Sequence, residues 1–503
     1  MFSFFKKKKS KTSQNENEKK SDKSLADVIA QLKKSSDFKQ KSFTNKETNA
    51  RFTIHFISTL IEDKIVQKDI LPYLLNGKFS GLDSMKNTVP NVECTVTGNP
   101  ETIAKKVLTG SVLVTMEGDD KKGVLFRAPV ELGRQVAPPE VEYSVEGPKQ
   151  AFVESLDQNI NLIRAYLPKE NFVCEELTIG NMTKTRVAIL YIDGVTNEEN
   201  IQTVRQRLKD IDFDLVLDSS IIEEIIADNT WSPFPELMDT ERPVKVAAGL
   251  SEGKVGIAVD RSPFVLLGPS TLSSFFASLD DYYMNWYLGT FIRVVRIMGI
   301  LFSMLATPLY VAVLTYHPEM IPKELMATLV SSRESVPFPP ILEALFLEFT
   351  IDLLREAGAR LPSKVGQTIG IVGGIVLGTA SVEAGLTSNV LLILVSLSAL
   401  AAFTTPNYKI SNTVRLLRFP FLLFAQLWGM LGINICAWFI LAHLLRMTSL
   451  GRPYLEPLYP LRISDMRDAL VRLPLKNQNV RPGFLNSGKP VRFKDKKKKD
   501  IDE

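Results

Sequence analysis

The chain has 503 residues, a formal net charge of +4 and 23% charged residues, values close to those of ordinary soluble proteins. The charges are unevenly placed, because almost all lie before Arg296 or after Arg446 and the sequence between them is mostly apolar. This pattern excludes a purely cytosolic enzyme, a disordered chain, collagen and a disulfide-stapled secreted module. So small a net charge gives no indication of nucleic-acid binding.

Cysteine, histidine and glycine patterns show no recognisable catalytic or metal-binding motif. Cys94, Cys174 and Cys436 lie far apart without CxxC spacing, and we expect the first two to be buried free thiols. The histidines form no HExxH or HxH pair, and no phosphate-loop, dinucleotide or esterase motif occurs. The sequence therefore predicts a protein that is not an enzyme, with no catalytic residue, metal site or cofactor.

Both termini are rich in lysine. Lys6–Lys9 follow a short apolar start, which reverses the order of a signal peptide, and Lys496–Lys499 stand near the other end. Residues 1–46 are predicted to form a disordered basic tail. Such clusters either keep a chain soluble or attract it to anionic membrane lipid, by about 1 kcal/mol per charge near the surface. The sequence leaves both interpretations open.

Strand-like and helix-like patterns alternate twice in the next part of the chain. Arg51–Ile57 and Arg186–Ile192 alternate apolar and polar residues, as half-buried strands do. A helical pattern follows each of them, the second near 197–210 after an Asp-Gly turn. Further on come hairpin-like strand pairs, at 111–116 with 123–127 and at 254–260 with 264–267. The similar order in both stretches predicts a weak internal repeat.

The predicted fold class is an α+β cytoplasmic N-terminal region followed by an all-α polytopic membrane domain. The N-terminal region contains two tandem α+β modules, over 47–137 and 171–285. A connecting segment over 138–170 contains a helix predicted for 148–167, with Pro148 in its first turn. The transmembrane helical domain is predicted for 286–450, and a polar C-terminal segment with a basic tail for 451–503.

Four uncharged runs approach or exceed the length that a helix needs to span a bilayer. They are Ile297–Thr315, Val365–Val382, Leu386–Tyr408 and Phe419–Ala442. A fifth segment, Ile341–Leu354, contains three carboxylates and is expected to be re-entrant, interfacial or buried among other helices.

The basic residues give a mixed prediction of topology. Arg293 and Arg296 precede the first span, so the positive-inside rule places the N-terminal modules in the cytoplasm. If the fifth segment crosses, the chain makes five crossings and ends outside. If it does not cross, four crossings leave both tails inside, and we prefer this second arrangement.

Glycine recurs at intervals of four within the second span, at Gly366, Gly370, Gly374 and Gly378. At 3.6 residues per turn these glycines form one slowly drifting ridge, along which another helix backbone can approach closely. The pattern favours helix packing within the subunit, a contact between subunits or a helix that lines a pore.

Carboxylates cluster on one predicted helix face. Glu348 and Asp352 are four residues apart, and Glu343 and Glu383 are further acidic residues of the apolar half. A charge at membrane depth costs at least about 2.5–3.5 kcal/mol, so these side chains need partners or a function. One interpretation is a salt-bridged interface with Arg355 and Arg360; the other is an acidic ring that lines a cation path in an oligomer.

Several longer motifs resemble one known family. They are Tyr316–Pro322, Val336–Pro339, Leu354–Gly358, Ile369–Gly374 and Val382–Gly385, with Glu146–Pro148, Asp193-Gly194 and Thr240–Pro243 upstream. Together they resemble the A subunit of spore germination receptors, the GerA family, over about residues 50–465.

The resemblance implies a multi-pass protein of the inner membrane of the bacterial endospore. Members of this family work with a transporter-like B-type subunit and a C-type lipoprotein, respond to nutrients, and are thought to form a homo-oligomeric, gated cation channel. A paralogous branch linked to dipicolinate release has the same architecture and is an alternative. A secondary transporter and a non-conducting membrane scaffold are further alternatives.

Overall fold

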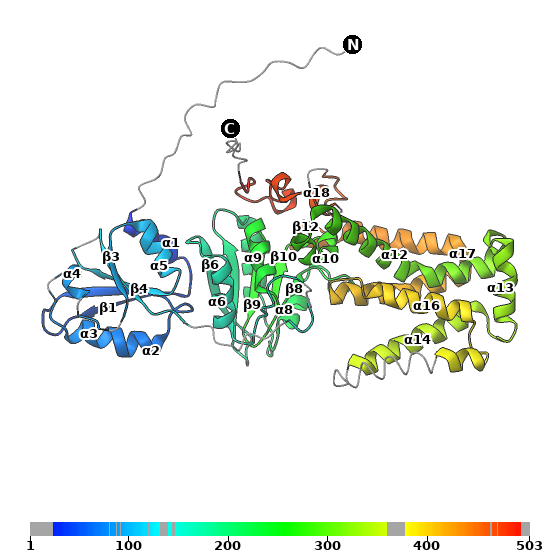
Figure 1. The fold of residues 1–503 in the computed structure, drawn as a ribbon, viewed down its shortest axis with the longest axis horizontal. Coiled ribbons are helices and arrows are strands. Elements are labelled where there is room, and N and C mark those ends of the chain that lie inside the picture. Colours follow the sequence, from blue (N-terminus) through cyan, green and yellow to red (C-terminus); the bar gives the residue numbers. More distant parts are fainter. Residues whose placement is uncertain are drawn as a thin grey trace, which may run out of the picture. The chain divides into compact units, whose positions relative to one another are not determined.

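The computed structural model describes residues 24–493 apart from 80, 87, 91, 119–120, 131–138, 143–145, 360–377, 463–464 and 470 (Figure 1). The chain divides into two compact units. One comprises 1–133 with 160–175, and the other comprises 134–159 with 176–503.

The first unit contains a five-stranded antiparallel sheet with strand order β1-β2-β4-β5-β3. Its elements are α1 (Leu25–Leu32), β1 (Phe38–Thr44), β2 (Arg51–Ile57), α2 (Asp63–Ile65), the π-helical turn Val66–Ile70, α3 (Leu71–Asn76), α4 (Leu82–Met85), β3 (Cys94–Thr97), α5 (Pro100–Val107), β4 (Ser111–Met116) and β5 (Gly123–Arg127). The connecting helix α6 is Leu156–Tyr166.

Alternation along the strands places apolar side chains on both faces of this sheet. In β4, Val112 and Val114 join a core on one face, whereas Leu113 joins a second core on the other face with α1 and α5. The predicted strand over 51–57 and the predicted hairpin are confirmed.

Two boundaries of this region differ from the prediction. The predicted tail over 1–46 extends too far, because α1 and β1 are ordered parts of the module. Ser24 caps α1, and Leu25, Val28 and Leu32 form a short apolar stripe that is buried. The connecting helix begins at Leu156, eight residues after Pro148, so the proline does not start it.

A buried ion pair ties the connecting helix to the first module. Arg164 and Asp37 are both fully buried, and the guanidinium donates to both carboxylate oxygens at 2.9 and 2.8 Å. Arg164 also donates to Ser35 at 2.9 Å.

The buried side chain of His55 makes the first module sensitive to acid. Burial lowers the pKa of His55 from 6.5 to about 4, and its Nε2 lies 3.0 Å from Thr115 Oγ1. The unfolded chain binds a proton more readily, so stability is expected to fall by about 3 kcal/mol between pH 6.5 and pH 4. Hydrogen-exchange protection of residues 51–57 in urea, measured at both ends of this range, checks the loss. Equal acid sensitivity in a His55→Gln variant would contradict it.

The second module repeats the topology of the first, with strand order β6-β7-β9-β10-β8. Its elements are β6 (Phe172–Ile179), β7 (Thr185–Ile192), α7 (Glu198–Lys209), α8 (Ser219–Ile226), β8 (Met238–Thr240), α9 (Pro243–Glu252), β9 (Val255–Val259), β10 (Val265–Gly268), α10 (Leu272–Phe276) and α11 (Asp280–Tyr283). Since the sequential positions of the strands in the two sheets correspond, the predicted pair of tandem α+β modules is confirmed.

Helices cover both faces of the second sheet. The apolar stripes of α7 and α8 pack on Val187, Ile189 and Ile257, and Leu250 of α9 approaches Gly256 from the other face. The core also includes Leu450, from beyond the helical region of the chain.

The remaining elements form the predicted helical region and a C-terminal segment. They are α12 (Trp286–Tyr316), the 3₁₀ turn Pro318–Met320, α13 (Lys323–Arg333), α14 (Pro340–Ala359), a helical stretch over 378–383, α16 (Asn389–Ala402), α17 (Tyr408–Arg446), β11 (Thr448–Ser449), β12 (Arg452–Pro453), α18 (Met466–Ala469) and the 3₁₀ turns Leu475–Asn477 and Gly483–Leu485.

Candidate functional site

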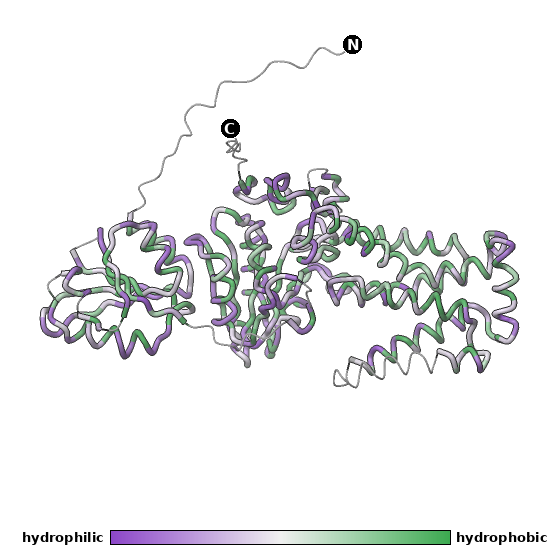
Figure 2. The backbone as a smooth tube through the Cα atoms, in the orientation of Figure 1, coloured by the Kyte–Doolittle hydropathy of each residue, from purple (hydrophilic) through white to green (hydrophobic). Residues whose placement is uncertain are grey.

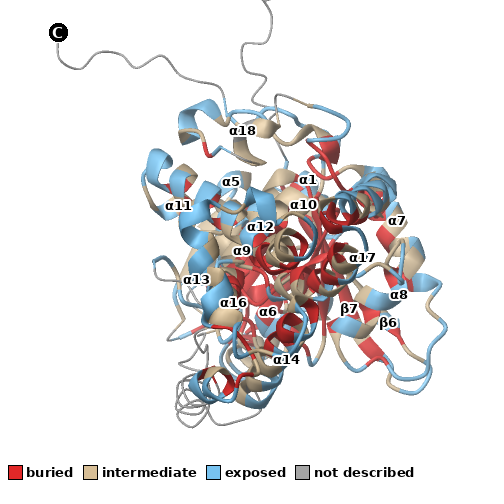
Figure 3. Cartoon of the chain, turned by 90° about the vertical axis from the view of Figure 1, so that its right-hand side faces the viewer, coloured by how far each residue is buried: buried red, intermediate tan, exposed pale blue. Residues whose placement is uncertain are grey.

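The helical domain, α12 to α17, exposes a large apolar surface. Figure 2 shows its helices as mostly hydrophobic, and α12 and α17 are both long and apolar enough to cross a membrane. Seen from the end of the domain in Figure 3, buried residues gather between α12 and α17. Exposed large apolar side chains occur on all its main helices, among them Phe291, Met298, Phe349, Leu353, Ile393, Leu400, Leu423 and Phe439. An outward apolar surface of this kind is typical of contact with lipid.

Helix α17 reverses direction at its middle. Thr413 Oγ1 donates to the carbonyl of Pro233, and His443 Nε2 lies 2.9 Å from Ser232 Oγ, so both ends of α17 meet adjacent residues of the second module. Straight helix would separate these ends by about 45 Å. The reversal occurs at Trp428 and Gly429, whose backbone angles are not helical.

The turn of this hairpin lies against the end of α12. Tyr316 Oη donates to the carbonyls of Gln426 and Leu427 at 2.9 and 3.1 Å, which satisfies groups that a helix end leaves unpaired. Gly429 has φ +56°. The single span predicted for Phe419–Ala442 is therefore wrong, because a stretch without charges conceals a turn.

The chain returns to the second module after α17. Arg481 donates to the carbonyl of Ser251 at 2.8 Å, Arg492 pairs with Glu252 at 2.9 Å, and Gly488 N–H donates to Val195. The helical domain therefore starts and ends at the second module.

A buried ion pair occupies the interior of the helical domain. Glu348 of α14 is 1% exposed and pairs with Arg418 of α17. Thr307 of α12 donates to Glu348 Oε1 at 2.8 Å, and Arg418 donates to Ser303 at 3.1 Å. Four polar side chains from three helices therefore meet among apolar neighbours. Their hydrogen bonds and the ion pair offset the cost of burying polar groups away from water.

Two further carboxylates of α14 have arginine partners from other elements. The fully buried Glu343 pairs with Arg333 of α13 at 2.8 Å and accepts from the backbone N–H of Ser388 at 3.1 Å. Asp352 pairs with Arg415 of α17 at 2.9 Å and is partly exposed. Glu343, Glu348 and Asp352 are thus each paired with an arginine of another helix.

The other predicted site residues are more dispersed. Arg355 lies with its guanidinium 4.2 Å from the ring centre of Phe403, and Glu383 is exposed. A Cβ at Gly378 would lie 3.5 Å from Leu392, at ordinary packing distance. Arg360, Gly366, Gly370 and Gly374 lie outside the described residues.

Charged residues also fasten the helical domain to the second module. Asp281 is buried and accepts from both Arg293 and Arg296 of α12, at 3.2 and 3.0 Å. Lys409 of α17 pairs with Glu223 and with Asp239. Burial raises the pKa of Glu223, and the charge of Lys409 opposes that shift. The sequence indicated this junction through Arg293 and Arg296, which flank a predicted span. It did not identify Asp281 as their partner.

The chain has close relatives over most of its length. It is 46% identical to the spore germination protein GerQA of Bacillus cereus over 94% of each chain. It is 45% identical to GerIA of Bacillus cereus, over 90% of this chain and 68% of that one. It is 37% identical to spore germination protein A1 of Bacillus subtilis (strain 168), over 90% of this chain and 94% of that one.

A solved structure and a family profile also match. The crystal structure of the N-terminal domain of the A subunit of the Bacillus megaterium spore germinant receptor GerK3 aligns with a TM-score of 0.39 and 25% identity, over 49% of this chain and 94% of that one. Residues 26–484 match the profile of the GerA spore germination proteins, which confirms the resemblance of the sequence motifs. The chain belongs to the Bacillus/Clostridium GerA spore germination protein family.

Proposed function

We propose that the protein is the A subunit of a nutrient-responsive germinant receptor in the inner membrane of the endospore. Family membership and relatives named as spore germination proteins over 90% and 94% of the chain support this assignment. The exposed apolar helices support a membrane location. In this arrangement the two α+β modules and the C-terminal segment lie on the cytoplasmic, spore-core side.

The proposed receptor contains several copies of this chain with a B-type transporter-like subunit and a C-type lipoprotein. The apolar faces of α12, α14 and α16 offer surfaces for lipid and for these partners. The glycines predicted to form a ridge are proposed to lie at contacts between helices, although at Gly378 there is room for a Cβ at ordinary packing distance from Leu392.

The proposed activity is gated conduction of cations. The observation that supports it is the row of ion pairs on α14. Glu343, Glu348 and Asp352 are each neutralised by an arginine on another element. A closed state of this kind attracts no cation, because the charges cancel. Movement of α14 relative to α17 would separate Glu348 and Asp352 from their arginines and expose two carboxylates to an ion path.

Ion flux through the reconstituted receptor tests this proposal. The complete receptor, co-expressed with its B-type and C-type partners, is placed in a planar bilayer and activated by nutrient. A variant with Glu348→Gln and Asp352→Asn is expected to lose most of its preference for cations over anions, at least about tenfold. A variant with Glu319→Gln and Glu324→Gln makes the same charge change on the exposed 318–324 segment and should keep the preference.

The alternatives predict other outcomes. Unchanged selectivity in the Glu348 and Asp352 variant would refute their place in the ion path. A receptor that never conducts would favour the scaffold, and saturable flux of an organic substrate would favour a transporter.

A further inference from the structure

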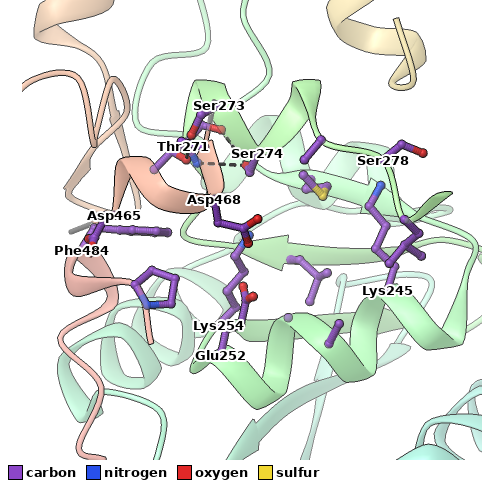
Figure 4. A pocket seen from close by; sticks show the side chains of 18 of the residues that line it. Lys245, Glu252, Lys254, Thr271, Ser273, Ser274, Ser278, Asp465, Asp468 and Phe484 are labelled. Atoms are coloured by element: carbon purple, nitrogen blue, oxygen red, sulfur yellow. Dashed lines mark hydrogen bonds between the residues drawn. The ribbon is translucent and has the colours of Figure 1, made fainter. Parts of the chain in front are cut away.

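A cavity of about 160 Å³ lies between the second module and the C-terminal segment. Its floor comes from α9 and from Lys254, just before β9, and its far wall includes Asp465, Asp468 and Phe484 of the C-terminal segment (Figure 4). In the sequence, one wall comes before the helical domain and the other comes after it. The cavity therefore exists only when the C-terminal segment has docked.

One lysine in this cavity forms no ion pair among the described residues, although the nearby charge of Glu252 acts to raise its pKa. Lys254 is 6% exposed, and within the described part of the chain its ammonium makes no hydrogen bond or ion pair. Its aliphatic stem passes beside Gly249, where a Cβ would lie 3.6 Å from the lysine Cδ. Burial lowers the pKa of Lys254 below its usual value. A buried amine without a partner is costly, so its presence at a cavity indicates a missing ligand.

The carboxylates around the cavity already have partners. Glu252 pairs with Arg492 at 2.9 Å, Asp465 accepts from the N–H of Gly483 at 2.6 Å, and Asp468 accepts from Tyr282 Oη at 2.7 Å. The second lysine, Lys245, pairs with Glu142 at 2.6 Å. Among the described charged side chains that line the cavity, Lys254 is thus the one without a hydrogen bond or an ion pair, and an anionic ligand would supply its partner.

The remaining walls are apolar and small. Met238, Leu267, Leu279 and Phe484 contribute side chains, and Ser273 and Ser274 offer hydroxyl groups. A cavity of this volume holds a molecule of about six non-hydrogen atoms, the size of benzene. A strongly hydrated divalent anion gains little binding free energy from apolar walls. A short aliphatic carboxylate can pair with the ammonium of Lys254 and pack its alkyl part on the apolar side chains.

We propose that this cavity binds a small monocarboxylate, whose anionic group pairs with the ammonium of Lys254 and whose aliphatic part packs on Leu267 and Phe484. The site is independent of ion conduction. It is connected to α12, because Asp468 lies 3.7 Å from Arg293 and bonds to Tyr282. A bound carboxylate stabilises the docked C-terminal segment and the start of the first long helix together.

Thermal unfolding of the full-length protein in detergent tests the site, with isovalerate as the probe. Isovalerate is expected to raise the unfolding temperature by about 2 °C or more, and isoamyl alcohol and inorganic phosphate are not. A Lys254→Met variant should lose the shift, while Lys209→Met, on an exposed face of α7, should keep it. An equal shift with the alcohol, a larger one with phosphate, or an unchanged response of Lys254→Met would overturn the proposal.

A second measurement does not depend on any variant. The isovalerate shift of the wild-type protein should shrink between pH 6.5 and pH 9.5, because the lysine loses its proton below its ordinary pKa when it is buried. A shift that stays constant over this range would also overturn the proposal. Without ligand, Lys254→Met should be at least as stable as wild type, since it removes an unpaired buried charge.

Discussion

Replacing Arg418 with methionine is expected to destabilise the helical domain by about 3–5 kcal/mol, because Glu348 then stays buried without a counter-charge. The Thr307 hydroxyl alone cannot compensate the carboxylate. Trp428 and Trp438 lie in α17, so intrinsic fluorescence during unfolding reports on this region once Trp231 and Trp286 are replaced by phenylalanine.

Two further variants make this result specific. Arg415→Met removes the partner of Asp352, and because both side chains are partly exposed the loss should be only about 1 kcal/mol. Combining Arg418→Met with Glu348→Gln should recover most of the loss, since it removes both charges. If the double variant is as unstable as Arg418→Met, the ion pair is not the cause.

Replacing Gly432 with alanine is expected to prevent the α17 hairpin from closing. The added Cβ would lie 2.6 Å from the carbonyl carbon of Phe424 and nearer still to its oxygen. Because both contacts are with backbone, no rotation of a side chain relieves them, and the cost should exceed about 3 kcal/mol. Hydrogen exchange of residues 424–436, together with the yield of monodisperse protein, measures the effect.

Gly378→Ala is the matched control for this substitution. It adds the same methyl group in the same domain, where the nearest atoms belong to a flexible leucine side chain at 3.5 Å. It should leave both exchange and yield close to wild type. Equal damage from the two substitutions would show that any glycine replacement in these helices is disruptive, and would contradict the specific role of Gly432.

The sequence predicted the two modules well because their signals are local. Alternation with a period of two identified β2 and β7, and the hairpins lie where short strands flank turn residues. The repeat was weak in sequence but is complete in topology. The start of the first module was missed because α1 is a single eight-residue apolar stretch that follows a lysine-rich and serine-rich segment, and because β1 has few apolar residues.

The helical domain was predicted less completely, because its decisive contacts join residues that are far apart in the sequence. The spacing of Glu348 and Asp352 showed a shared helix face, but their partners Arg418 and Arg415 lie more than 60 residues further along. Arginines counted as evidence for topology prove to be paired: Arg296 with Asp281, and Arg293 with Asp281 and Asp468. Hydropathy could not reveal the hairpin in α17, since the turn residues are themselves apolar.

The position of Leu450 in the core of the second module has a consequence for biosynthesis. This residue is buried beside Gly268 and Leu237, and Tyr454 is fully buried nearby, yet the ribosome makes both only after every helix of the apolar half. The second module therefore completes its core only after all the helices of the apolar half have been synthesised. On the proposed membrane location, final folding of this module follows insertion of the helices, so a defect in insertion would also leave the module without Leu450 in its core.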